Sequence, residues 1–344
     1  MKRPSLLTFA PATLIRHVET VLSRFRDHGL EPHAYLRAAV RQPPLFYQSP
    51  ATLAANIEAV ADHFAPAGLT LKDYLRAAVK APQLFYQSPA TIQANIEGVV
   101  GDFASHGLTL TAYLRAAVKQ PPLFYRSPAT LAANVEGLAT RFAPAGLTLK
   151  VYVAAALRQP FLFYLRADRI SANIDAVVEH FAPFGLTLKA YLAAALKQPQ
   201  LFSQAPATIQ SNIEGVVEHF RSDGLTLDAY LGAALRRPQL FCLAPATIIR
   251  HINCVIEMQR DGLLTFLGQQ DAPARQKLRP LFAFLVKNPM CMTLADDNYA
   301  LRQTYARVTG DRPGGAALLT RKRHRIERDL ARALGQPVPA SPSS

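Results

Sequence analysis

Hydrophobic residues in this chain recur with a helical period, and the pattern restarts at regular intervals. Residues 68–106 read GLTLKDYLRAAVKAPQLFYQSPATIQANIEGVVGDFASH. Within them, one helical face is apolar at Leu71, Tyr74, Leu75, Ala78 and Val79. Thr70 is suited to cap this helix at its start. Pro82 ends it, because proline lacks an N–H and restricts the residue before it.

A second helix follows in the same stretch. The apolar Leu84-Phe85-Tyr86 segment predicts one short 3₁₀ turn. Ser88-Pro89 then supplies an N-cap and a first helical residue. The apolar stripe of this second helix consists of Ile92, Asn95, Ile96, Val99, Val100 and Phe103. Gly107 is a typical helix C-terminal residue.

The pair of helices is repeated along the chain. Gly-Leu-Thr, or a close relative, recurs every 39 residues at Gly29, Gly68, Gly107, Gly146, Gly185 and Gly224, and Gly262-Leu263 follows after 38. So short a pair cannot bury its own apolar face, whereas stacked pairs can. The sequence therefore predicts an all-α fold, a right-handed α-solenoid of tandem 39-residue helix-turn-helix repeats.

The repeat also divides the chain into segments. Residues 280–306 resemble a degenerate copy, and GDRPGG at 310–315 is typical of a linker. We predict an N-terminal half-repeat cap (1–28), six repeats (29–261), a degenerate repeat or cap (262–309), a basic helix (310–335) and a disordered tail (336–344).

Composition excludes several classes of protein. The 344 residues are 50% hydrophobic and 18% charged, which is unlike a disordered chain. The spacing of Cys242, Cys254 and Cys291 matches neither a disulfide scaffold nor a zinc site, and no phosphate-binding loop is present. We therefore expect a monomer that is not an enzyme, with no cofactor, no metal and no membrane partner.

The N-terminal residues bear on the compartment. MKRPSLL is basic, but no signal-type apolar core follows it. The expected compartment is the cytoplasm. A non-cleaved signal read by a dedicated secretion system would escape this test.

The positive charge is concentrated at the ends of the chain. Lysine and arginine number 38 against 24 acidic residues, a net charge of +14. Residues 1–28 carry +3, the six repeats together +4, and residues 262–344 carry +7. The body of the repeats is only mildly basic.

One basic position does recur, two residues before the helix-ending proline. It is occupied by Arg41, Lys80, Lys119, Arg158, Lys197, Arg236 and, in the degenerate copy, Lys287. Such a row can follow a phosphate backbone. Alternatively, each cation offsets the helix macrodipole and binds free carbonyls of its helix C-terminus. Both uses are compatible. The C-terminal helix adds Arg321, Lys322, Arg323, Arg325 and Arg328 as candidate binding residues.

Two other rows have structural and functional interpretations. An asparagine lies on the apolar stripe of the second helix at Asn56, Asn95, Asn134, Asn173 and Asn212. We expect it to satisfy backbone groups rather than to read bases, because a buried amide needs partners. A tyrosine lies on the first helix at Tyr35, Tyr74, Tyr113, Tyr152, Tyr191 and Tyr230. We expect it in the core rather than stacked on bases.

The repeat unit Gly-Leu-Thr-Leu-x-x-Tyr-Leu-x-Ala-Ala-Val-Lys-x-Pro-x-Leu-Phe-Tyr-x-Ser-Pro, followed by Ile-x-x-Asn-Ile-x-x-Val-Val, resembles the mitochondrial transcription termination factor family over about residues 5–308. The alanine- and arginine-rich composition points to a bacterial relative. The resemblance implies a curved α-solenoid that binds nucleic acid mostly through phosphates, with Arg41, Lys80, Lys119, Arg158, Lys197 and Arg236 as binding candidates.

Two functions remain open from the sequence. The first is DNA or RNA binding through the row of cations and the basic C-terminal helix. The second is a protein-interaction scaffold, for example an exported bacterial effector, whose variable helix positions contact a protein partner. The resemblance and the C-terminal charge favour the first, and the mild charge of the repeats favours the second.

Overall fold

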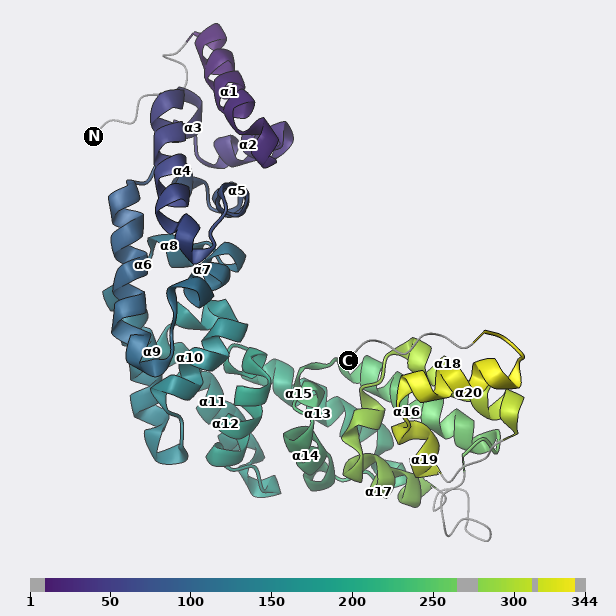
Figure 1. Cartoon of the computed structure of the whole chain (residues 1–344). Helices are drawn as coiled ribbons and strands as arrows, with labels where there is room; N and C mark the ends of the chain where they lie inside the picture. The colour runs from purple at the N-terminus through teal and green to yellow at the C-terminus, as the bar shows by residue number, and fades with distance from the viewer. Residues whose placement is uncertain (1–9, 265–277, 311–314, 338–344) are drawn as a thin grey trace. The chain divides into compact units, whose positions relative to one another are not determined.

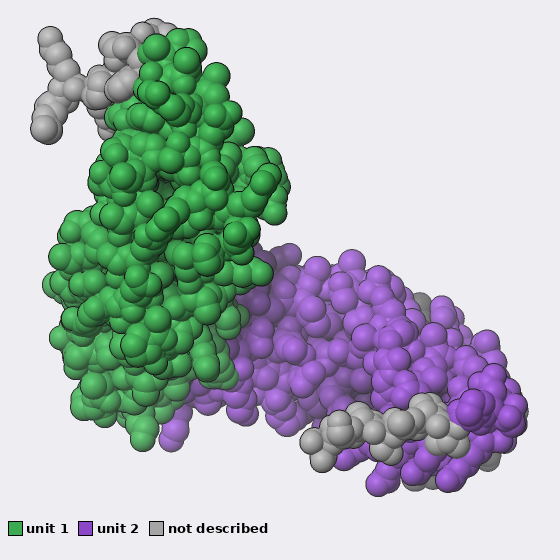
Figure 2. All heavy atoms as spheres, turned by 45° about the horizontal axis from the view of Figure 1, so that its top comes forward, with its two compact units in different colours: residues 1–171 green, residues 172–344 purple. Residues whose placement is uncertain are grey.

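A computed structural model describes residues 10–264, 278–310 and 315–337. These residues form helices and connecting turns with no strand among them, which confirms the all-α prediction. Contacts divide the chain into two compact units, residues 1–171 (unit 1) and 172–344 (unit 2), shown in green and purple in Figure 2. The sequence predicts no boundary there. No helix in the described ranges combines the length and apolarity needed to cross a membrane.

The first helix of each repeat ends two residues before a proline, and all of these helices except α2, which follows Glu31, begin after a threonine. Thr70, Thr109, Thr148 and Thr187 each accept a hydrogen bond from the backbone N–H three residues on, as the sequence predicts. These first helices are α2 (Pro32–Arg41), α5 (Leu71–Lys80), α7 (Leu110–Lys119) and α10 (Leu149–Arg158) in unit 1, and α12 (Leu188–Lys197) and α14 (Leu227–Arg236) in unit 2.

A single helical turn links the two helices of each repeat. It is 3₁₀ in η4 (Pro82–Phe85), η7 (Pro160–Phe163) and η9 (Pro199–Phe202), as predicted. It is one α-helical turn in α3 (Pro44–Tyr47), α8 (Pro122–Tyr125) and α15 (Gln239–Cys242). The proline that ends the first helix begins or precedes this turn, where its missing N–H costs nothing.

The second helices are longer, and most begin with proline as their first residue. They are α1 (Pro11–Phe25), α4 (Pro50–Phe64), α6 (Pro89–Phe103) and α9 (Pro128–Phe142) in unit 1, α11 (Ala167–Phe181) at the unit boundary, and α13 (Pro206–Phe220) and α16 (Pro245–Arg260) in unit 2. Ser88 occupies the predicted N-cap position, but its side chain makes no capping bond, unlike Ser127.

A short 3₁₀ turn and a glycine close each repeat. The turns are η2 (Arg26–His28), η3 (Ala65–Ala67), η5 (Ala104–His106), η6 (Ala143–Ala145), η8 (Ala182–Phe184) and η10 (Arg221–Asp223). The glycine that follows is left-handed, for example Gly107 at φ +88°. A side chain is disfavoured there, which explains why glycine recurs at this position.

The degenerate copy keeps the same order of elements. It consists of α17 (Arg279–Lys287), η12 (Pro289–Met292) and α18 (Asp296–Thr309). The single basic helix predicted for 310–335 is wrong, because this segment forms α19 (Gly315–Thr320) and α20 (Arg323–Ala333). The guanidinium of Arg302 donates to the carbonyls of Leu318 (3.2 Å) and Arg321 (2.8 Å). These hydrogen bonds cap the C-terminal end of α19. The tail predicted to be disordered lies, from residue 338, outside the described residues.

Equivalent helices of neighbouring repeats contact one another, so each unit has two layers. In unit 1, α4, α6 and α9 form one series of contacts and α2, α5, α7 and α10 another. In Figure 1, α6 and α9 run along the left edge of this unit, with α5 and α7 to their right. We call these series the second-helix layer and the first-helix layer.

The recurring tyrosine lies in the core, as expected. All six of these tyrosines are fully buried. The hydroxyl of Tyr74 donates to the carbonyl of Leu84 at 3.0 Å, and that of Tyr113 to the carbonyl of Leu123 at 2.9 Å. The same bond recurs from Tyr35, Tyr152 and Tyr191. The ring edges of Tyr35, Tyr74, Tyr113 and Tyr191 also meet a phenylalanine of the next repeat, as Tyr74 meets Phe124 at 5.5 Å between centroids.

Replacing Tyr113 tests this bond. Tyr113→Phe leaves the buried Leu123 carbonyl without its donor, so we expect the free energy of unfolding to fall by about 1–3 kcal/mol. Tyr230→Phe is the matched control, because the Tyr230 hydroxyl has no hydrogen-bond partner among the described residues. Urea unfolding followed by circular dichroism measures both. Equal losses in the two variants would contradict the prediction.

The buried tyrosines also predict an alkaline transition. Burial raises the pKa of each of these hydroxyls above its usual value of 10.0. Because the pKa of each tyrosine is higher in the folded protein than in the unfolded chain, the protonated hydroxyls favour the folded state. Their contribution to the free energy of unfolding is complete below about pH 10 and is lost as the pH rises further. We expect tyrosinate absorbance at 295 nm to rise together with loss of helical circular dichroism. Titration of these tyrosines near pH 10 with the helices intact would be the opposite result.

Candidate nucleic-acid interface

The seven cations of the predicted row lie on the surface. Each is the last residue of a first helix, or of α17 in the degenerate copy, and each side chain is exposed. The row comprises Arg41, Lys80, Lys119 and Arg158 in unit 1, and Lys197, Arg236 and Lys287 in unit 2. In each unit they therefore lie along the same edge of the first-helix layer.

Two arginines of this row contact the next first helix. Arg41 donates from Nη2 to the carbonyl of Val79 at 2.5 Å and from Nη1 to that of Lys80 at 3.5 Å. Arg236 donates to the carbonyl of Val286 at the end of α17. These cations thus bind free C-terminal carbonyls, but those of the following helix rather than their own. A guanidinium has five N–H donors, so this contact leaves donors available.

A second column of cations stands beside the row in unit 1. Arg37, Arg76 and Arg115 lie four residues before the row position, which places them on the same helical face, and all three are exposed. Lys72 and Lys150 continue this face towards the helix N-termini. The sequence carries the signal for Arg37, Arg76 and Arg115 as a basic residue four positions before the row cation.

The first-helix layer of unit 1 is therefore uniformly basic. With histidine counted as neutral, α2, α7 and α10 each carry two cations and no acid, and α5 carries three cations against Asp73, so each helix has a net charge of +2. Asp73 pairs with Arg76 at 3.1 Å. We define the basic face of unit 1 as Arg37, Arg41, Lys72, Arg76, Lys80, Arg115, Lys119, Lys150 and Arg158.

Two helices of the second-helix layer, α4 and α6, have the opposite charge, whereas the N-terminal second helix α1 carries Arg16, Arg24 and Glu19, a net charge of +1. α4 carries Glu58 and Asp62, and α6 carries Glu97 and Asp102, with no lysine or arginine in either helix. α9 is neutral, with Glu136 and Arg141. The small net charge of the repeats thus conceals a separation of charge between the two layers.

Some charged side chains of the second helices form ion pairs with a second helix of the neighbouring repeat. Arg24 pairs with Glu58 at 2.7 Å, and His63 pairs with Glu97 at 2.7 Å. In unit 2, His180 pairs with Glu214 at 2.6 Å. The partner of His180 lies 34 residues away in the sequence. These exposed pairs each contribute little to stability.

The basic surface is less uniform in unit 2. α12 carries Lys189 and Lys197, and α17 carries Arg279 and Lys287, but in α14 Asp228 offsets Arg236. The column at i−4 is replaced by Ala193 in α12 and Gly232 in α14. Unit 1 therefore offers the denser array of cations.

The candidate binding residues of the C-terminal helices are mostly paired. Arg323 contacts Asp297 at 2.5 Å and Glu327 at 2.7 Å. Arg321 donates to the Tyr305 hydroxyl at 2.6 Å, and Arg328 lies 3.6 Å from Asp329. α20 also packs against α18. Lys322 and Arg325 remain exposed. Three of the five candidate binding residues in this segment, Arg321, Arg323 and Arg328, thus have partners within unit 2.

One asparagine of the recurring row, Asn212, makes a structural hydrogen bond to the backbone of the next repeat. Asn212 is buried and donates from Nδ2 to the carbonyl of Phe241, in the linking turn of the next repeat, at 2.9 Å. His251 occupies the same position one repeat later, and its Nδ1 lies 2.9 Å from the carbonyl of Met292. The expectation that this row satisfies backbone groups is therefore confirmed at Asn212.

The cysteines are poor nucleophiles. Burial raises the pKa of Cys242 to about 11 and that of Cys291 to about 12, and it also raises the pKa of Cys254. At neutral pH these thiols remain protonated, and the thiolate is the reactive form. Across the described residues, no group of three or more histidine, cysteine or acidic side chains is placed to hold a metal ion.

No protein-family model matches the chain, and no curated protein matches it.

Substitution in the row separates the carbonyl contact from plain surface charge. We expect Arg41→Ala to lower the free energy of unfolding by about 1 kcal/mol more than Lys119→Ala, because, of these two residues, Arg41 alone donates to backbone carbonyls. Both variants lose one exposed cation at a helix C-terminus. Thermal and urea unfolding give the difference. An equal effect of the two substitutions would contradict it.

Proposed function

We propose that this chain is a nucleic-acid-binding protein that contacts the phosphate backbone through the basic face of unit 1. The observation that carries the proposal is the separation of charge between the layers. Four successive first helices each carry +2, while α4 and α6 of the second-helix layer each carry −2. A polyanion is attracted to the first and repelled by the second.

The geometry of the face suits a chain of phosphates. Cations on one helix at i and i+4 are about 6 Å apart, and packed helices lie about 8–10 Å apart. The face thus presents a grid of charges at intervals that a nucleic-acid backbone can follow. Because the same residue types recur in each repeat, the face contacts phosphates in register without reading base sequence.

The proposal includes the finer architecture predicted from the sequence. In each unit, helices 39 residues apart contact their equivalents, which supports a right-handed α-solenoid of tandem repeats. In this proposal the protein acts as a cytoplasmic monomer, uses no cofactor and catalyses no reaction. The C-terminal cations have a minor role, because Arg321, Arg323 and Arg328 have partners within unit 2.

A protein-interaction scaffold is the second candidate. It is favoured by exposed or half-exposed positions that vary between repeats, such as Gln93, Ala132 and Gln210 on the second helices. The acidic helices α4 and α6 suit a basic protein partner. In this alternative the chain is an exported bacterial effector without a nucleic-acid role.

Binding of labelled nucleic acid decides between the two. We expect the full chain to bind duplex DNA, single-stranded DNA or RNA in fluorescence anisotropy at about 50 mM salt and to weaken steeply at about 200 mM. A variant with Arg37, Arg76, Arg115 and Lys119 changed to Gln should bind at least about tenfold more weakly. Its salt slope should fall by about three to four, because each lost phosphate contact contributes about 0.9.

The matched control removes the same charge elsewhere. Arg16→Gln, Arg26→Gln, Arg169→Gln and Arg260→Gln also remove four exposed cations, none of them in the basic face or among the candidate binding residues. This variant should keep most of the affinity. The proposal fails if no nucleic acid binds at about 50 mM salt, or if the control loses as much affinity as the basic-face variant. Absence of binding would favour the scaffold.

A further inference from the structure

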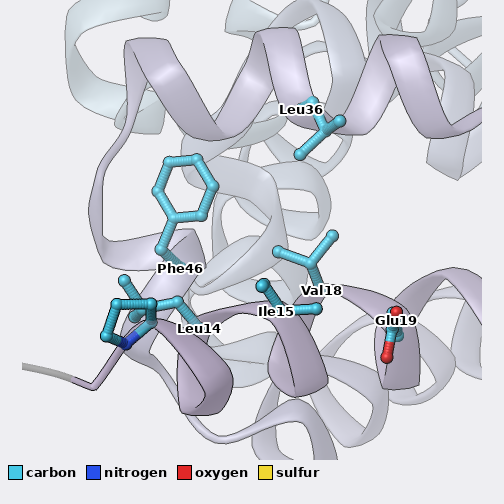
Figure 3. Close-up of a pocket in the computed structure, with 7 residues that line it drawn as sticks. Leu14, Ile15, Val18, Glu19, Leu36 and Phe46 are labelled. Carbon is cyan, nitrogen blue, oxygen red and sulfur yellow. The ribbon is translucent and has the colours of Figure 1, made fainter.

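An apolar pocket of about 550 Å³ lies at the N-terminal end of unit 1. Figure 3 shows it between α1, which contributes Leu14, Ile15 and Val18, and the side chains of Leu36 and Phe46 on α2 and α3. Glu19 lies at one end of the pocket. Among the described residues, no helix covers this face.

Two of these residues, Leu36 and Phe46, have buried equivalents in every later repeat, whereas the equivalents of Ile15, such as Ala54 and Gln93, are half-exposed. Leu36 is 42% exposed, whereas Leu75 and Leu114, at the equivalent positions of the next two repeats, are each 2% exposed. Phe46 is half-exposed, whereas Phe85 and Phe124 are fully buried. The side of the pocket formed by Leu36 and Phe46 is therefore the packing surface that each later repeat buries against its neighbour.

The next interface in the chain shows what covers such a surface. α2 packs against both α5 and η4. Tyr35 of α2 places its ring edge-on against Phe85 at 5.5 Å, and Ala38 and Ala39 of α2 are fully buried. Arg41, at the end of α2, donates to the carbonyls of Val79 and Lys80. A first helix thus brings an aromatic ring, two small residues and a terminal cation.

The pocket presents the same contact positions, so it fits a helix that carries the same set of groups. Phe46 takes the position of Phe85, and Leu36 takes that of Leu75. The carbonyl equivalent to that of Val79 belongs to Val40, whose side chain is 71% exposed at the end of α2. A helix with small residues can approach closely here, and one with large residues at the alanine positions cannot.

We propose that this pocket binds an amphipathic α-helix of a partner protein whose apolar face repeats the first-helix pattern Tyr-Leu-x-Ala-Ala-x-Arg. The tyrosine packs on Phe46, the alanines allow close approach to Leu36 and Ile15, and the arginine binds the carbonyl of Val40. A second copy of this chain is a poor occupant, because the first helices of internal repeats are already buried in their own cores. This inference does not depend on nucleic-acid binding.

The test uses the full chain and a synthetic peptide of residues 29–43, GLEPHAYLRAAVRQP, labelled at one end. We expect saturable binding in fluorescence polarisation. Ile15→Glu or Leu36→Glu should weaken it at least about tenfold, because a carboxylate would be buried against an apolar face. Both side chains are exposed, so these variants should fold. Val151→Glu is the matched control, since Val151 is 40% exposed on another first helix, α10.

A second peptide tests the recognition pattern itself. The peptide with Tyr35→Ala should bind at least about tenfold more weakly than the parent peptide, because the edge contact with Phe46 is lost. Circular dichroism of each protein variant checks that it is folded, and light scattering of the chain alone gives its oligomeric state.

Three results would overturn the proposal. The first is no binding at the solubility limit of the peptide, and the second is binding that Ile15→Glu and Leu36→Glu leave unchanged. The third is self-association of the chain that Ile15→Glu abolishes, which would assign the face to a second copy. Loss of peptide binding in the two pocket variants alone supports it.

Discussion

In five of the six first helices, a tyrosine hydroxyl donates to the carbonyl of a leucine ten residues later, and this bond ties the linking turn to the first helix. The Tyr230 hydroxyl has no such partner among the described residues. Proline ends the first helix and has no N–H, so the linking turn has few donors of its own. The leucine is nonetheless fully buried, as at Leu84 and Leu123. An unpaired buried carbonyl costs about 1–3 kcal/mol. The tyrosine removes this cost and fixes where the second helix begins.

The same side chain also joins neighbouring repeats. The ring of Tyr74 packs edge-on against Phe124, and that of Tyr113 against Phe163. The aromatic contact and the hydroxyl bond use different parts of one residue, so closure of one repeat and contact with the next are coupled. This explains why tyrosine recurs at this position, since phenylalanine would supply only the ring.

Local features were predictable from the sequence, because their partners lie within a few residues. The threonine caps, the proline ends and the left-handed glycines follow from backbone chemistry at single positions. Partners in the next repeat were not predictable. The 39-residue period says that His180 and Glu214 recur, but not that they face each other, and the break after Thr320 depends on Arg302, from a different helix.

The candidate site was predicted in part for the same reason. The row of cations is visible as one repeated slot, and its exposure follows from its place opposite the buried tyrosine and alanines. The second column at Arg37, Arg76 and Arg115 required only that the helical period be read at i−4. The sequence did not predict which carbonyl Arg41 binds, because that carbonyl belongs to the end of the first helix in the following repeat.

Structural and binding roles of the row cations are compatible on physical grounds. Arg41 uses its terminal nitrogens on the carbonyls of α5, yet its charge remains and its side chain is exposed. A carbonyl pair offsets only part of a full positive charge. Helix termination alone demands one cation per first helix, at its last residue. The additional cations at Arg37, Arg76 and Arg115 lie a full turn before that end, where macrodipole compensation has faded. The excess of positive charge on the first-helix layer of unit 1 is therefore larger than the fold requires.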